Sequence, residues 1–230
     1  MEFATTQFWL AALEIIVINI LLSGDNAVVI ALACRNLPRK QRKWGVIWGA
    51  VGAIVLRIIL TFFAVTLLKL PWLKIIGGAL LLWIGVKLIA EEGGDDAGGE
   101  GKVQASDKLL AAVRTVIIAD LVMSIDNVLG VAAAAKGSLL LLVFGLVVSI
   151  PLVIAGSQLI MKLIERFPIL ILAGGGLLGY VAGEMVVEDV AIEPWIKANA
   201  HALEWIIPAA GIVVVIGVAK WMQRRHEQTA

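Results

Sequence analysis

The segments LLSGDNAVVI, residues 21–30, and LVMSIDNVLG, residues 121–130, decide the fold, because each places an Asp-Asn pair inside a long apolar run. An aspartate at the centre of a membrane-spanning helix costs about 2.5–3.5 kcal/mol on insertion scales, and more by other estimates. Serine and asparagine alone could simply link neighbouring helices by hydrogen bonds. Carboxylates that occur twice in the same setting indicate a functional site instead.

The composition around these motifs is that of a helical membrane protein. Of the 230 residues, 60% are hydrophobic and only 16% are charged, whereas a soluble domain has about a quarter charged residues. The alternating ten-residue strands of a transmembrane barrel are not found in the sequence. Apolar runs of about twenty residues predict seven spanning helices, at residues 8–33, 44–68, 71–90, 110–135, 138–162, 168–188 and 203–221.

The two Asp-Asn motifs belong to an internal repeat. A shift of 101 positions aligns four polar residues of the first span with four of the fourth: Asp25 with Asp126, Asn26 with Asn127, Ser23 with Ser124, and Asn19 with Asp120. A shift of 97 positions aligns the segment from Pro71 with the segment from Pro168. Each repeat has three spans, so the second repeat must cross the membrane in the opposite sense to the first.

The predicted fold is therefore an all-α membrane protein with two inverted three-helix repeats and a seventh helix. Repeat 1 covers residues 1–90, and repeat 2 covers residues 110–188. The glycine-rich acidic segment 91–109 between them is predicted to be a flexible cytoplasmic linker. An outer loop, residues 189–202, leads to the seventh helix and a cytoplasmic tail, residues 203–230.

Basic residues predict how the chain is oriented. The first connection, CRNLPRKQRKW at residues 34–44, is rich in lysine and arginine, and later connections on the same side carry most of the others. The positive-inside rule then places the N-terminus outside and the C-terminus in the cytoplasm. Spans one and four run antiparallel in this topology, so the two Asp-Asn motifs can converge near the membrane midplane, where inverted-repeat transporters bind their substrates.

The residue types of the two motifs favour a divalent cation as the substrate. Carboxylates, side-chain amides and hydroxyls are hard oxygen donors, which suit Mg²⁺, Ca²⁺ and Mn²⁺. Both histidines lie outside the predicted spans, so no imidazole ligand for a softer metal ion is expected at the motifs. The predicted metal ligands are Asp25, Asp126, Asn26, Asn127, Ser23, Ser124, Asn19 and Asp120. Gly24 would allow the first span to unwind at the motif.

Three further charged residues are candidates for a supporting role. Arg57 lies in the middle of span two, where a buried arginine needs a carboxylate partner, and the candidates are Asp120 and Asp25. Lys87 and Glu184 occupy equivalent positions late in spans three and six. Either they extend to the membrane interface as snorkelling side chains, or they act as a gate or in proton coupling.

The repeated SGDN and SIDN motifs, the basic connection after the first, and the segments GGALLLWIGVKL and GGGLLGYVAGE resemble the TerC family of integral membrane proteins. The shorter bacterial members, of YjbE or YkoY type, are the most similar. The resemblance covers essentially the whole chain. It implies a seven-helix protein of the plasma membrane (the bacterial inner membrane) that exports manganese, with Asp25, Asn26, Asp126 and Asn127 as functional residues.

The sequence thus predicts a transporter and no enzyme, with Mn²⁺ as cargo, moved through a midplane site by alternating access. Three alternatives remain at this point: a membrane scaffold or partner that supplies metal to secreted proteins, a Ca²⁺ transporter, and an intramembrane aspartyl protease. The protease is disfavoured because the sequence before Asp25 lacks the Gly-x-Gly-Asp pattern. The expected partners are a divalent cation and the lipid bilayer but no nucleic acid, and a homo-oligomer or a secretion-machinery partner stays open.

Overall fold

The computed structural model describes residues 9–10, 13–17, 24–90, 105–134 and 138–229, which contain helices and connections but no strand. The chain divides into two compact units. Unit 1 is Met1–Leu68 with Leu109–Lys162, and unit 2 is Lys69–Lys108 with Leu163–Ala230. Each unit therefore combines a segment from the first half of the sequence with a segment from the second half.

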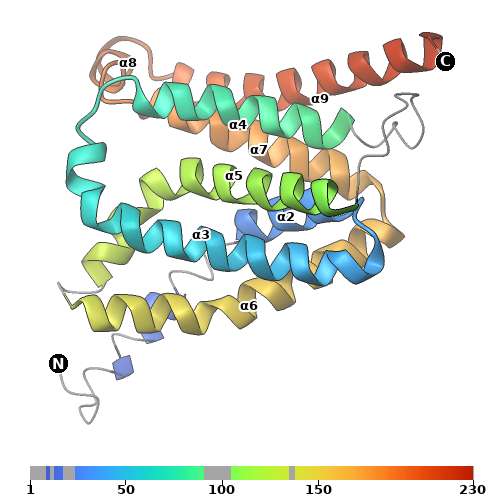
Figure 1. The fold of residues 1–230 in the computed structure, drawn as a ribbon. Helices are drawn as coiled ribbons and strands as arrows, with labels where there is room; N and C mark the ends of the chain where they lie inside the picture. Colours follow the sequence, from blue (N-terminus) through green and yellow to red (C-terminus); the bar gives the residue numbers. More distant parts are fainter. Residues whose placement is uncertain (1–8, 11–12, 18–23, 91–104, 135–137, 230) are drawn as a thin grey trace. The chain divides into compact units, whose positions relative to one another are not determined.

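Unit 1 contains the helices that carry both Asp-Asn motifs. These are α2 (Gly24–Cys34), α3 (Arg39–Leu67), most of α5 (Ala105–Ala134) and most of α6 (Leu139–Arg166), as Figure 1 shows. An apolar cluster joins α3 and α6 to the helical segment at residues 13–17; its buried members are Ile15, Ile54, Leu141, Leu142 and Leu146. The van der Waals contacts of these side chains stabilise the unit outside the polar motifs.

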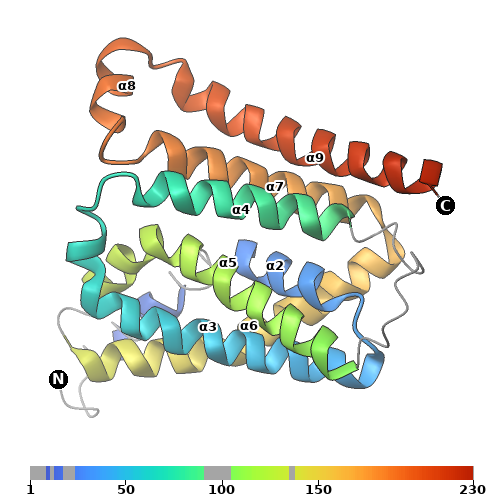
Figure 2. The same ribbon diagram turned by 45° about the horizontal axis from the view of Figure 1, so that its top comes forward.

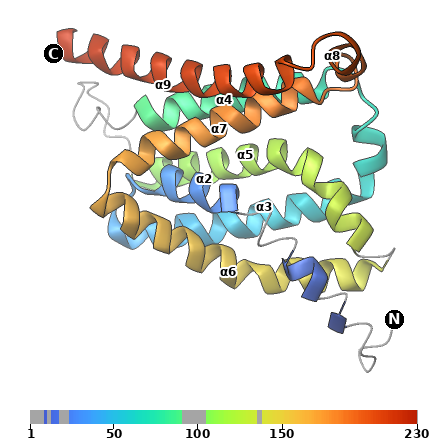
Figure 3. The ribbon, with the colours of Figure 1, turned by 180° about the vertical axis from the view of Figure 1, so that it is seen from behind.

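Unit 2 is built from α4 (Leu73–Ala90), α7 (Ile169–Val187) and α9 (Leu203–Thr229), which lie side by side in Figures 2 and 3. Glycines allow these helices to approach closely. A Cβ added to Gly179 of α7 would meet the backbone of Gly211 in α9, and a Cβ on Gly211 would meet the Gly179 carbonyl group. Small residues at such a crossing are typical of helices that associate within a membrane.

The connection between α7 and α9 differs from the predicted loop at residues 189–202. It contains a short helix, α8 (Glu193–Asn199), with Pro194 in its first turn. Proline is well tolerated there, because the first turn of a helix has no intrahelical use for its N–H group.

Five of the described helices, α3, α4, α6, α7 and α9, are long and apolar enough to span a membrane, and α2 is a shorter apolar helix. The 30 residues of α5 correspond to about 45 Å of helix, which also exceeds the hydrocarbon thickness. Residues 18–23, in the predicted first span, lie outside the described residues. The helical membrane architecture is confirmed, and the count of seven spans stays a prediction.

Two contacts between α4 and α7 are exchanged by a shift of 97 positions in the sequence. In unit 2, a Cβ on Gly78 would lie 2.7 Å from the Ala182 carbonyl oxygen, and a Cβ on Gly175 would lie 3.6 Å from the Gly85 carbonyl oxygen. A shift of 97 positions takes Gly78 to Gly175 and Gly85 to Ala182, so it exchanges the two pairs. Because Gly78 faces Ala182 while Gly85 faces Gly175, α4 and α7 run antiparallel.

Small residues also allow close approach in unit 1. Gly145 of α6 faces Ile15, and Gly49 of α3 faces Val116 of α5 with a Cβ distance of 3.0 Å. Glycines therefore lie at a helix contact of α6 and at the contact between α3 and α5.

Candidate functional site

A buried ion pair joins α3 to α5 in the interior of unit 1. Nη2 of Arg57 donates a hydrogen bond to Oδ1 of Asp120 at 2.6 Å. The Nε–H group of Arg57 donates to Oγ of Ser124 at 3.0 Å, and that hydroxyl donates to Oδ2 of Asp120 at 3.1 Å. The three side chains form a closed network, and Arg57 and Asp120 are only 3% and 5% exposed.

This network settles which carboxylate pairs with Arg57: the partner is Asp120. Helical spacing explains how α5 supplies both acceptors, because Asp120 and Ser124 stand four residues apart and so lie on one face. The planar guanidinium then donates from Nη2 to one residue and from Nε to the other. Removal of either charge would leave the other buried without compensation.

A small cavity lies beside the ion pair. Its volume is about 20 Å³, and its polar lining comes from Asn26, Arg57, Asp120 and Ser149. This space is close to the minimum that a single water molecule requires. The cavity is therefore large enough for one water-sized guest and too small for an organic substrate.

Asn26 is the least satisfied polar residue at this cavity. It is 4% exposed, and neither Nδ2 nor Oδ1 has a hydrogen-bond partner within the part of the chain that the structure describes. Buried amides are nearly always paired, so such a group commonly marks a place where water or an ion binds. The Asp-Asn motif of the first span thus presents an available oxygen at the cavity.

Asp25 lies next to this group at the start of α2. Its Oδ1 accepts a hydrogen bond from the backbone N–H group of Asn26 at 2.8 Å. Asp25 is also close enough to Arg57 and Asp120 to interact with both electrostatically. The structure therefore brings Asp25, Asn26, Asp120, Ser124 and Arg57 together in one region of unit 1.

The other predicted ligands are described less fully. Asp126 and Asn127 lie on α5, where Asn127 is partly buried, and the side chain of Asp126 is outside the described part of the structure. Asn19 and Ser23 also lie outside the described residues, as does any break of the first span just before Gly24. Among the side chains that are described, no three carboxylate, imidazole or thiol groups are placed to hold a metal ion together.

Glu184 and Lys87 lie in unit 2, toward opposite ends of the antiparallel α4–α7 pair. Glu184 is hydrogen-bonded to Tyr180 and lines a cavity of about 300 Å³ together with Lys74, Glu188 and Glu204. Lys87 places its Nζ atom 5.5 Å from the centre of the Trp83 ring, which is a cation–π geometry.

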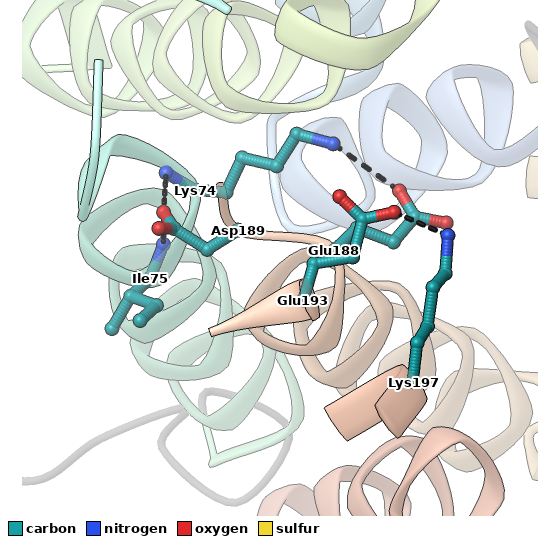
Figure 4. Close-up of polar contacts among 6 residues, drawn as sticks. All are labelled: Lys74, Ile75, Glu188, Asp189, Glu193 and Lys197. Carbon is teal, nitrogen blue, oxygen red and sulfur yellow. Dashed lines mark hydrogen bonds and ion pairs between the residues drawn. The ribbon is translucent and has the colours of Figure 1, made fainter. Parts of the chain in front are cut away.

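Asp189 was missed in the sequence, although its carboxylate is fully buried. Figure 4 shows it against the start of α4, where it accepts backbone hydrogen bonds from Lys74 at 3.0 Å and Ile75 at 3.3 Å. It also accepts from the backbone of Trp72 at 2.9 Å, which has a left-handed φ of 70°. Asp189 therefore caps the N-terminus of α4, and no local pattern could reveal it because 115 residues separate Lys74 from Asp189.

The electrostatics of Asp189 follow from this capping role. Burial raises the pKa of its carboxyl group, but four backbone N–H donors, those of Ala191, Trp72, Ile75 and Lys74, outweigh that effect. The net pKa lies below the ordinary value of 3.8. Asp189 is thus a charged structural group that follows the end of α7 and binds the start of α4.

Ser149 is a second residue that sequence reasoning left out. It is 2% exposed, lines the small cavity, and donates its hydroxyl hydrogen to the Gly145 carbonyl oxygen at 2.8 Å. A serine among the apolar residues of span five was the available signal. It carried little weight because serine in a spanning helix commonly bonds to its own backbone in this way.

The chain is similar to membrane proteins over nearly its full length. Residues 4–227 match the family described as "Integral membrane protein TerC family". The uncharacterized membrane protein YjbE of Bacillus subtilis is 41% identical over 95% of this chain and 97% of its own. The uncharacterized membrane protein YceF of the same organism is 29% identical over 94% and 85%.

More distant relatives extend this similarity to another bacterium. The UPF0053 inner membrane protein YgdQ of Escherichia coli is 24% identical over 70% of this chain and 73% of its own length. No solved structure matches the chain. From the apolar helices, the repeated Asp-Asn motifs and the match over residues 4–227, we conclude that this chain belongs to the TerC family of integral membrane proteins.

Proposed function

We propose that this protein exports a divalent metal cation, with Mn²⁺ as its preferred cargo, across the bacterial plasma membrane. One observation carries the proposal: hard oxygen donors of Asp25, Asn26, Asp120 and Ser124 converge in unit 1, where the buried amide of Asn26 lacks a partner among the described residues. A cation or its water ligand would satisfy that amide, which otherwise bears a desolvation cost.

The donor set supports a hard cation over other cargo. Carboxylate, amide and hydroxyl oxygens suit Mn²⁺, Ca²⁺ and Mg²⁺, and the small cavity fits an ion or a water molecule and excludes larger solutes. Cys34 lies at the end of α2 and is outside the cavity lining. Mn²⁺ is preferred over the other two cations because the resemblance to the TerC family implies manganese export.

The inverted repeat forms part of the proposal. It is supported by the antiparallel α4–α7 pair and by the contacts of Gly78 with Ala182 and of Gly85 with Gly175, which a shift of 97 positions exchanges. Under this symmetry Asp126 and Asn127 of α5 correspond to Asp25 and Asn26, and both aspartates belong to one cation site. The site would open alternately to the cytoplasm and to the outside, with the N-terminus outside and the C-terminus in the cytoplasm.

A flux measurement on purified protein tests this function. The full chain is reconstituted in liposomes that contain a Mn²⁺-sensitive dye, and the uptake of Mn²⁺ is followed. We expect Asp25→Asn and Asp126→Asn to abolish transport, because binding of a divalent ion depends on the charge of its ligands. Asn26→Ala and Asn127→Ala should reduce it less, since water can replace a neutral donor.

Asp107→Asn is the matched control, because Asp107 is an exposed carboxylate in the first turn of α5. It should transport like the unaltered protein. Transport that survives Asp25→Asn and Asp126→Asn would favour a metal-supplying scaffold instead. Selective movement of Ca²⁺ in a parallel assay would reassign the cargo, and a deletion strain with unchanged intracellular manganese would argue against export.

A further inference from the structure

We propose that Arg57 is an intramolecular counter-cation, which neutralises Asp120 in the substrate-free protein and yields that carboxylate to the transported metal ion. This inference rests on the proposed function, because it places Asp120 on the path of a divalent cation. It adds a mechanism for how the empty site is kept stable and how the cargo is released.

The hydrogen bonds show that Arg57 occupies the groups a cation would need. Its guanidinium bonds Asp120 at 2.6 Å and Ser124 at 3.0 Å, and Ser124 in turn bonds the second oxygen of Asp120 at 3.1 Å. Both carboxylate oxygens of Asp120 are therefore engaged. A metal ion bound there must compete with Arg57 for Asp120 and for the Ser124 hydroxyl.

Charge makes this competition strong. Only 4% of the Arg57 side chain and 6% of the Asp120 side chain are exposed, so solvent screens their interaction little. A divalent cation at Asp120 would lie within a few ångströms of the guanidinium, and like charges repel strongly at that distance away from water. The two cations therefore exclude each other, and Arg57 must shift when metal binds.

The empty site also depends on Arg57. Without a cation nearby, Asp120 would be a buried, uncompensated charge next to Asp25, which is energetically costly. An exporter has to release its cargo and return without it. The guanidinium of Arg57 serves both steps. It lowers the affinity of Asp120 for the metal ion, which favours release, and it neutralises Asp120 after the metal ion has left.

The cavity beside the ion pair gives the guanidinium a place for a short displacement. Arg57 and Asp120 both line this space of about 20 Å³, as does Asn26, whose buried amide has no hydrogen-bond partner among the described residues. A purely structural ion pair between α3 and α5 would need neither the cavity nor the neighbouring unpaired amide. Their presence beside the pair favours an exchangeable interaction.

The experiment measures Mn²⁺ binding to the full-length purified protein in lipid nanodiscs by calorimetric titration. For Arg57→Gln we expect a Kd for Mn²⁺ about tenfold lower than that of the unaltered protein, because the competing charge is gone. Arg57→Lys should fall between the two, since a lysine keeps the charge but cannot bridge Asp120 and Ser124 with a planar fork. Arg114→Gln removes the same charge at an exposed position of α5 and should leave the Kd unchanged.

A thermal melt of the same samples supplies the second readout. Arg57→Gln without metal should melt at a lower temperature than the unaltered protein, and saturating Mn²⁺ should restore most of that loss. A structural ion pair predicts the lower melting temperature but no gain in affinity. Equal or weaker Mn²⁺ binding in Arg57→Gln would thus overturn the counter-cation role while leaving the proposed function intact.

Two other outcomes are equally decisive. If Arg57→Gln does not fold, the comparison of Arg57→Lys with the unaltered protein decides, and a Kd that is not lower in Arg57→Lys rejects the proposal. If the unaltered protein binds none of Mn²⁺, Ca²⁺ and Mg²⁺, the proposed function fails and this inference fails with it.

Discussion

In unit 1, α3 and α5 are joined by the charged side chains of Arg57 and Asp120, whereas in unit 2, α7 and α9 meet backbone to backbone at Gly179 and Gly211. The first arrangement is costly to bury and depends on each partner being present. The second contains no charge and depends only on the absence of side chains. The contrast therefore lies between a buried charged contact of α3 with α5 in unit 1 and an uncharged backbone contact of α7 with α9 in unit 2.

The difference separates two tasks that a membrane transporter must combine. A cation site needs buried carboxylates and amides, and these destabilise the helices that carry them. Glycine crossings allow extensive van der Waals contact, which stabilises helix association where lipid offers no hydrophobic driving force. Predictions that alter one type of contact without the other can therefore test this comparison.

The largest effect is expected at the buried ion pair. Replacement of Asp120 by Leu leaves Arg57 buried without its counter-charge, and Arg57→Leu does the converse. Each single variant should lower the free energy of unfolding by about 3–5 kcal/mol, and the double variant should lose much less than their sum. Chemical unfolding of all four proteins in detergent measures the coupling, and additive losses would show that the pair does not act as a unit.

A slightly smaller effect is expected at the glycine crossing. A side chain at Gly211 would overlap the carbonyl group of Gly179, and backbone cannot move aside as a flexible side chain can. Gly211→Val should therefore lower the free energy of unfolding by about 3 kcal/mol. Gly217→Val is the control on the same helix, because no atom lies within 4 Å of a Cβ there. Similar melting temperatures for the two variants would refute the close contact.

The Asp189 cap should show a moderate effect that depends on pH. Asp189→Asn keeps one acceptor oxygen but loses the charge, and should cost about 1–2 kcal/mol at pH 7. Because the folded-state pKa of Asp189 is lowered, its stabilising contribution is complete above the ordinary value of 3.8 and is lost as the pH falls through the lowered value. The gap between the two proteins should therefore close in melts recorded below pH 3.8, and a gap that stays constant with pH would contradict the capping role.

Features with a regular spacing could be predicted from the sequence. Apolar runs located the helices α3, α4, α6, α7 and α9, and their observed ends differ from the predicted ones by at most eight residues. The repeat identified eight polar residues, and four of them, Asp25, Asn26, Asp120 and Ser124, lie together in unit 1. Periodicity and repetition are properties of the chain itself, so no tertiary information was needed.

Features that depend on distant contacts could not be predicted. Two carboxylates were possible partners for Arg57, and only the tertiary structure selects Asp120. Asp189 and the start of α4 are more than a hundred positions apart, so neither segment indicates the other. The division into two units could not be predicted from the sequence either, because each unit joins segments from both halves of the chain.

The smallest effect, and the only gain, is expected at Asn26. Its buried amide has no partner among the described residues, so folding removes it from water without a compensating hydrogen bond. Leucine has a similar size and no polar atoms, and Asn26→Leu should raise the free energy of unfolding by about 1 kcal/mol. The same variant should transport Mn²⁺ more slowly, because an oxygen donor at the cavity is lost.

Ser149→Ala provides the comparison for this prediction. The Ser149 hydroxyl is already bonded to the Gly145 carbonyl oxygen, so its removal should bring no such gain in stability. A variant of Asn26 that is less stable than the unaltered protein would show that the amide is satisfied in solution, and unit 1 would then lose the unsatisfied buried group that sets its α3–α5 region apart from the backbone contact of Gly179 with Gly211 in unit 2.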